Sequence, residues 1–237
     1  MRTDNIDRHK TIRSMVRGFF EGLFSALIEK VDNGNGESRS VIVKRLIMDN
    51  YENIAGYFTQ AMFPIIARVN YDSLDDLSSK MKEKHVGDHT PLKLLMRMAC
   101  GSKEAYECMT AEYRRQIESL LCGHIETPAE HLAVEFMPSS LAPVPVPQAI
   151  RGVVRSMMQG YVVGIRATDG SGFQQRTILR MMINGMHTLL HDTEISDWGV
   201  NPDLDDIYRI VSKDGENYEV LINEMNQASE ASIPQPY

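Results

Sequence analysis

The sequence predicts an all-α protein, and three observations support this fold class. Apolar residues recur every three to four positions in most segments, which is the spacing of one helical face. No segment shows a convincing alternation of apolar and polar residues, the pattern that a half-buried strand needs. The chain has 237 residues, of which 43% are hydrophobic and 24% are charged, so it is long enough to bury a substantial core.

The N-terminal part predicts four helices separated by short breaks. Apolar positions over 12–27 share one face of a first helix, which ends at the glycine-rich and asparagine-rich loop 33–36. A serine caps a short second helix over 38–48. After a break at Asp49-Asn50, residues 51–58 form a third helix, and Thr59 caps a fourth helix that runs through Val69.

The middle of the chain predicts further helices and one extended connection. Pro64 lies beyond the first turn of the fourth helix, where a proline can kink it. Thr90 and Pro91 start a helix at Leu92, which Gly101-Ser102 interrupts, and an amphipathic helix then follows over 102–123. Four prolines between 138 and 147 predict a semi-extended surface connection.

Two long amphipathic helices follow, over 148–167 and 173–191. A loop of four residues at 169–172 joins them, and so short a loop predicts an antiparallel pair. Glycines in this pair would let the helix backbones approach closely: Gly152, Gly160, Gly164 and Gly185. The apolar residues Leu204, Ile207, Tyr208 and Val211 predict an extra helix docked on the body, with about the last ten residues loose.

Charge is unevenly distributed along the chain. Residues 1–17 hold five basic side chains against two acidic ones, a balance of +3, whereas residues 200–237 hold two against eight, a balance of −6. The net charge of −7 argues against a chain coated with phosphate-binding lysines. No secretory leader or membrane-spanning segment is recognisable, and the cysteines form no CxxC, so we expect a cytoplasmic protein that has no membrane contact.

The sequence gives little support for catalysis. It contains no HExxH, GxGxxG, Walker or GxSxG motif, so we expect neither an enzyme nor a cofactor. The histidines that could pair on a metal are His85 with His89, His124 with His131, and His187 with His191. A catalytic zinc needs three protein ligands, so such pairs are a weak signal. A metal-dependent enzyme built on them stays open as a weaker alternative.

The order of the predicted helices resembles the TetR family of bacterial transcription regulators. Residues 40–46 look like the first helix of that family's helix-turn-helix, and residues 53–58, which end in Tyr57-Phe58, look like its recognition helix. Residues 59–69 then resemble the linking helix, and the pair over 148–191 resembles the helices that form a four-helix bundle across the dimer axis.

This resemblance implies a head over 1–70 that carries the helix-turn-helix and a body over 71–237. The body would be a helical ligand-binding and dimerisation domain with an acidic C-terminal extension, and the homodimer would form through residues 148–191. The residues expected to contact operator DNA are Arg2, Arg8, Lys10, Arg39, Lys44, Arg45, Tyr51, Asn53 and Tyr57. Those expected to line a pocket among the methionine-rich inner faces are Met98, Met109, Tyr113, Met157, Tyr161 and Met181.

Two functions therefore follow from the sequence. The first is a ligand-responsive, DNA-binding repressor of TetR type, which a small apolar effector releases by favouring wrongly spaced reading heads. The second is a TetR-like helical ligand-binding or interaction protein whose DNA-binding head has degenerated. The long loop before the second helix, the acidic Glu52 at the start of the reading helix and the overall acidity favour the second function.

Overall fold

The structure is a computed structural model that describes residues 5–31, 45–71, 74–83, 92–122, 142–167 and 202–231. Nearly all of these residues lie in helices, which confirms the predicted all-α class. Among the described helices, none is both long enough and apolar enough to cross a membrane.

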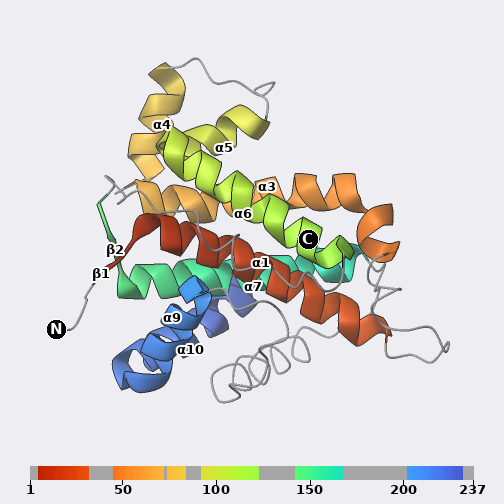
Figure 1. The fold of residues 1–237 in the computed structure, drawn as a ribbon. Coiled ribbons are helices and arrows are strands. Elements are labelled where there is room, and N and C mark those ends of the chain that lie inside the picture. Colours follow the sequence, from red (N-terminus) through yellow and green to blue (C-terminus); the bar gives the residue numbers. More distant parts are fainter. Residues whose placement is uncertain are drawn as a thin grey trace.

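Two long helices, α1 (Arg8–Val31) and α7 (Val146–Ala167), lie at the centre of the fold (Figure 1). They run parallel, because Gly152 lies beside Met15 near their N-termini and Gly164 lies beside Ala26 further along. The two helices start together at a ladder between strands β1 (Asn5–Ile6) and β2 (Val144–Pro145). We expected no strand, and this antiparallel ladder is too short for an alternating pattern to reveal it.

Glycines allow α1 and α7 to approach until their backbones touch. A Cβ atom at Gly160 would lie 1.8 Å from the carbonyl oxygen of Phe19, and one at Gly22 would lie 2.0 Å from that of Met157. No side chain larger than hydrogen fits at either position without moving a backbone. The pair therefore packs more closely than ordinary helices, whose axes lie roughly 8–10 Å apart.

The predicted partner of the α7 glycines was wrong. Gly152, Gly160 and Gly164 were expected to serve the pair over 148–191, but they make room for α1 instead. Gly185 and the second predicted helix, 173–191, lie outside the described residues. The spacing of small residues identifies the helix face that allows close approach, but it does not identify the helix that occupies it.

A first layer covers one side of the central pair. It consists of α3 (Tyr51–Asn70), α5 (Leu92–Cys100) and α6 (Lys103–Cys122), with α4 (Leu74–Glu83) at its edge (Figure 1). The break between α5 and α6 is the one that the sequence predicts, with Gly101 at φ 73° and the Ser102 hydroxyl accepting a hydrogen bond from the Ala105 amide at 3.1 Å.

The prediction of separate helices over 51–58 and 59–69 was wrong, because α3 is one continuous helix of 20 residues. The Thr59 hydroxyl donates to the carbonyl of Ala55 at 3.0 Å, a bond within the helix that replaces the expected cap. The helix also continues through Pro64. Residues 45–48 are helical as predicted, the helix includes Asp49 where a break was expected, and Asn50 occupies the position before α3.

A second layer, α9 (Pro202–Lys213) and α10 (Gly215–Ala231), covers the opposite side of the central pair (Figure 1). The predicted docking of α9 is confirmed, since Leu204, Ile207, Tyr208 and Val211 are all buried. The expectation of about ten loose residues was too generous, because α10 continues to Ala231, and 232–237 lie outside the described residues.

The hydrophobic core is continuous across residue 70, where the sequence predicts a domain boundary. Buried residues of α1 and α3 belong to the same cluster as those of α6, α7, α9 and α10. Helix α1 lies in the predicted head, yet its most extensive packing is against α7 in the predicted body. The division into 1–70 and 71–237 therefore does not coincide with a break in packing.

Candidate functional site

The residues expected to contact DNA lie toward opposite ends of the central pair. Arg8 and Lys10 are in the first turn of α1, whereas Arg45 lies just before α3 and Asn53 in its first turn, alongside the C-terminal half of α1 (Figure 1). The ring of Phe58 lies 5.0 Å from that of Phe19, which fixes the level of α3 against α1. At 1.5 Å per helical residue, Lys10 and Asn53 are separated by roughly 20 Å along the helix axis.

The corner between residues 45–49 and α3 is not basic. Arg45 is exposed there, but so are Asp49 and Glu52, which leaves these three charges with a balance of −1. Carboxylates next to a phosphate backbone oppose binding. Arg2, Arg39 and Lys44 and the side chain of Tyr51 lie outside the described residues, and Tyr57 is half-buried.

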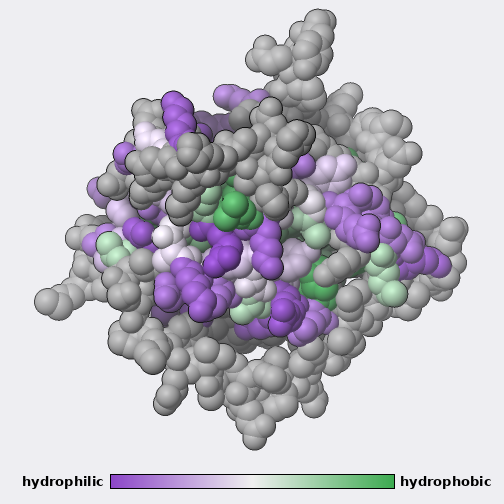
Figure 2. Space-filling view, turned by 90° about the horizontal axis from the view of Figure 1, so that it is seen from above, coloured by the Kyte–Doolittle hydropathy of each residue, from purple (hydrophilic) through white to green (hydrophobic). Residues whose placement is uncertain are grey.

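The surface of the first layer is mainly hydrophilic. Figure 2 shows the molecule from above, and its described residues present charged and polar side chains with small, separate hydrophobic areas between them. The large apolar side chains that stand out as exposed in the described part are Met48 at 67% and Leu94 at 44%. Isolated residues of this kind are normal on a soluble surface and do not by themselves mark a binding site.

The described residues expected to line an effector pocket are buried, except the half-buried Tyr113, and they fall into separate groups. The ring of Tyr113 packs on Phe58 at 4.7 Å, on the side of the first layer. Met157 and Tyr161 instead lie against Gly22, where α1 meets α7. The backbone of α1 passes between these two groups.

Two further expected pocket residues form a third group, and one lies outside the described residues. Met98 and Met109 are buried in the first layer, where the Cys100 thiol lies 4.0 Å from the sulfur of Met109. Met181 is outside the described residues. The described pocket candidates thus belong to the core or pack against it, on more than one side of α1.

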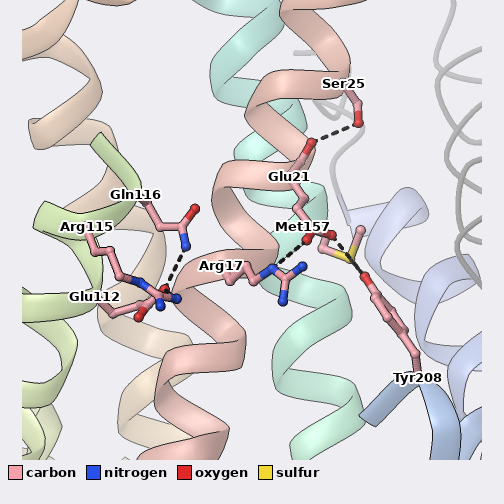
Figure 3. Close-up of polar contacts among 8 residues, drawn as sticks. All are labelled: Arg17, Glu21, Ser25, Glu112, Arg115, Gln116, Met157 and Tyr208. Carbon is pink, nitrogen blue, oxygen red and sulfur yellow. Dashed lines mark hydrogen bonds and ion pairs between the residues drawn. The ribbon is translucent and has the colours of Figure 1, made fainter. Parts of the chain in front are cut away.

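A polar cluster that the sequence did not indicate joins α1, α7 and α9 (Figure 3). We call it the Glu21 cluster. The Glu21 carboxylate pairs with the Arg17 Nε at 2.9 Å and accepts a hydrogen bond from the Tyr208 hydroxyl at 3.1 Å. The same hydroxyl lies 3.7 Å from the Met157 sulfur. The spacing of Arg17 and Glu21 suits a helical ion pair, but the contact with Tyr208 spans 187 residues and leaves no local signal.

A second ionic contact joins α10 to α7. The Glu224 side chain is 3% exposed, and its carboxylate contacts the Nε of Arg155 directly and lies 3.9 Å from that of Arg151. A carboxylate this deeply buried is tolerated only when cations or donors compensate its charge. The two arginines are one helical turn apart on α7, so they reach the same carboxylate.

Another buried carboxylate, Glu112 on α6, is compensated within its own helix. It accepts hydrogen bonds from Arg115 at 2.8 Å and from Gln116 at 2.7 Å (Figure 3). The partners stand three and four positions further along, where helical geometry brings side chains together. This arrangement compensates the carboxylate buried in the middle of α6.

The buried Cys100 of the first layer is a poor nucleophile. Burial, with a smaller contribution from the nearby Cys108 thiol, raises the pKa of the Cys100 thiol to about 12. Burial also raises the pKa of Tyr71, whose hydroxyl donates to the carbonyl of Met98 at 2.5 Å. At neutral pH the Cys100 thiol is therefore protonated, and a buried protonated thiol does not act as a nucleophile.

Metal chemistry finds no support in the described part of the chain. No group of three or more histidine, cysteine, aspartate or glutamate side chains there is placed to hold a metal ion. All of the paired histidines, from His85 to His191, lie outside the described residues. Metal analysis of the purified protein is the direct test of that alternative.

Comparisons with known proteins do not add a family. No family model, curated protein or solved structure matches this chain.

Proposed function

We propose that this chain is a helical binding protein that regulates by engaging a ligand or a partner, without catalysing a reaction. The observation that supports the proposal is the position of α1. A DNA-reading head must move relative to its body to respond to an effector, but α1 is locked to α7 through Gly22 and Gly160.

The charges and positions of the candidate DNA contacts support the same proposal. Lys10 near the start of α1 and Asn53 in the first turn of α3 are separated by roughly 20 Å along the helix axis. Affinity for DNA comes mainly from several basic side chains that face the phosphates together. The corner offers Arg45 together with Asp49 and Glu52, which is a poor electrostatic match to a duplex.

The core composition suggests how a ligand would be accommodated. The chain has fifteen methionines, and the buried ones occur on both sides of α1. Methionine is flexible and polarizable, so a methionine-rich core can repack around an apolar molecule at low cost. We therefore expect a small apolar ligand to enter between α1 and a covering layer.

A second candidate function, the TetR-type repressor, has one observation in its favour. Arg45, before α3, and Asn53, in its first turn, are both exposed, on either side of Asn50. Arginine is suited to phosphate and guanine, and asparagine can pair with adenine. In this proposal a homodimer binds operator DNA in the cytoplasm and a small apolar effector releases it.

One experiment separates the two proposals. Mobility-shift titrations of the full chain use genomic fragments, including the region upstream of its own gene, at low and at moderate salt. We expect no sequence-selective complex. A salt-sensitive complex that Arg45→Ala and Asn53→Ala weaken, but exposed Gln60→Ala does not, would overturn the first proposal in favour of the repressor.

Ligand binding is tested on its own by methyl spectroscopy of the methionines. Apolar molecules of increasing size are titrated into labelled protein, and the signals are assigned by single Met→Leu substitutions. We expect saturable shifts at buried Met157 or Met109 and none at exposed Met48. Shifts confined to Met48 would mean surface adsorption and would contradict a ligand-binding role.

A further inference from the structure

The second layer is attached to the central pair through a buried charge. We call α9 and α10 together, Pro202–Ala231, the strap. We propose that the strap detaches from α1 and α7 as a unit while the first layer stays in place, and that Arg155 controls this opening. The inference goes beyond the proposed function, since it does not depend on which molecule the chain binds.

The strap is coherent enough to move as one body. Its two helices contact each other, and Asp214 alone separates them in sequence. The Asp214 carboxylate accepts a hydrogen bond from the amide of Glu216 at 3.0 Å, which caps the start of α10. The turn between α9 and α10 is therefore stabilised within the strap and does not depend on the central pair.

The docked state depends on whether the Glu224 charge is compensated. Apolar burial favours docking through Leu204, Ile207, Val211, Leu221 and Met225. Docking also takes the Glu224 carboxylate to 3% exposure, where Arg155 and Arg151 of α7 pair with it. Arg155 makes the closer contact, so its loss would leave a buried and poorly compensated charge, which strongly disfavours docking.

A second polar contact holds the other half of the strap. The Tyr208 hydroxyl of α9 donates to Glu21 of α1, which also pairs with Arg17. Both attachments of the strap thus include a carboxylate and an arginine. The first layer packs on the opposite side of α1 through aromatic rings such as Phe58 and Phe20, 6.1 Å apart, so strap opening leaves those contacts intact.

The experiment is hydrogen exchange of the full chain, read separately for the strap and for the first layer. In Arg155→Gln we expect exchange in α9 and α10 to accelerate about a hundredfold, because a buried carboxylate loses its main partner. Exchange in α3 and α6 should stay within about twofold of the parent. The exposed arginine Arg114 on α6 supplies the matched control, Arg114→Gln, which should change neither layer.

A second substitution distinguishes uncompensated charge from general damage. In the double variant Arg155→Gln with Glu224→Gln no charge is buried, so we expect strap protection to return toward that of the parent. The proposal is overturned if Arg155→Gln leaves the strap protected, if both layers lose protection together, or if the double variant exchanges as fast as the single one.

Discussion

The two layers that cover the α1–α7 pair are held by different kinds of contact. The first layer is attached by aromatic rings, with Phe58 in contact with Phe19, Phe20 and Tyr113. The strap adds to its apolar face a buried ion pair at Glu224 and a hydrogen bond to Glu21. Apolar contacts do not depend on the charge of any side chain, whereas burial of a carboxylate is costly when its cationic partner is lost. The comparison teaches that attachment of the strap depends on charge compensation, whereas attachment of the first layer through its aromatic rings does not.

The largest effect should come from separating α1 from α7, the pair on which both layers pack. In Gly160→Leu the new side chain would begin 1.8 Å from the Phe19 carbonyl, so α1 and α7 cannot stay in contact. We expect loss of more than about 4 kcal/mol of unfolding free energy and collapse of both layers. Urea titration followed by circular dichroism measures this loss of unfolding free energy.

The control for this substitution is a glycine outside the contact. A Cβ at Gly56 in α3 would meet nothing within 4 Å. Gly56→Ala should therefore stabilise the protein by up to about 1 kcal/mol through helix propensity. Equal destabilisation by the two variants would contradict the close packing of α1 and α7.

The attachment of the first layer is tested at Phe58. Phe58 is 4% exposed and contacts three other rings, so Phe58→Ala should cost about 3–5 kcal/mol of unfolding free energy. Urea denaturation measures this loss, which should be the same at low and at high salt. The exposed neighbour Gln60→Ala is expected to change stability by less than about 0.5 kcal/mol. A strong dependence of the Phe58→Ala loss on salt would break the distinction between the layers.

A smaller effect is expected from the hydroxyl that joins α9 to α1. Tyr208→Phe removes the hydrogen bond to Glu21 and keeps the ring, so it should cost about 1 kcal/mol, or up to roughly 3 kcal/mol because the acceptor is charged. Hydrogen exchange should place the loss in α9 more than in α3. Tyr106→Phe, in the first layer, is the comparison. Equal protection of α9 in Tyr208→Phe and in the parent would show that the hydroxyl does not hold the strap.

The smallest effect concerns pH and belongs to the first layer. The Cys100 pKa is raised from 9.0 to about 12 in the folded chain, so the unfolded thiol ionises first as pH rises. The stability that the folded thiol contributes is complete below pH 9 and is lost between about 9 and 12. At pH 10 the loss is about 1.4 kcal/mol or less. Urea titrations from pH 8 to 10 should show it in the parent and not in Cys100→Ala, whereas an identical decline in both would assign it to other groups.

Local patterns predicted many of the helices, but not α4, α10 or the partners of each helix. The apolar spacing in α1, α6, α7 and α9 and the Gly101-Ser102 break predicted those elements, because helix faces and caps are written in neighbouring residues. The continuity of α3 was missed because Thr59 suits both a cap and a mid-helix bond to Ala55. A serine or threonine pattern alone cannot choose between them.

The candidate sites were harder to predict than the fold. The Glu21 cluster needs Tyr208 from the far end of the chain, and Glu224 finds Arg155 on another helix, 69 residues away. Neither pairing has a sequence spacing that signals it. The methionines Met98, Met109 and Met157 were correctly expected to be inside, but composition could not reveal that α1 would lie between them.

The parallel pairing of α1 with α7 also affects how the protein is made. The glycine face of α1 is matched by a helix that begins only at Val146, so the ribosome must add residues 32–145 before that face can be covered. At about 5–20 residues per second this delay is on the order of 10 s. During that time the face of α1 around Gly18 and Gly22 lacks the helix that covers it in the folded protein.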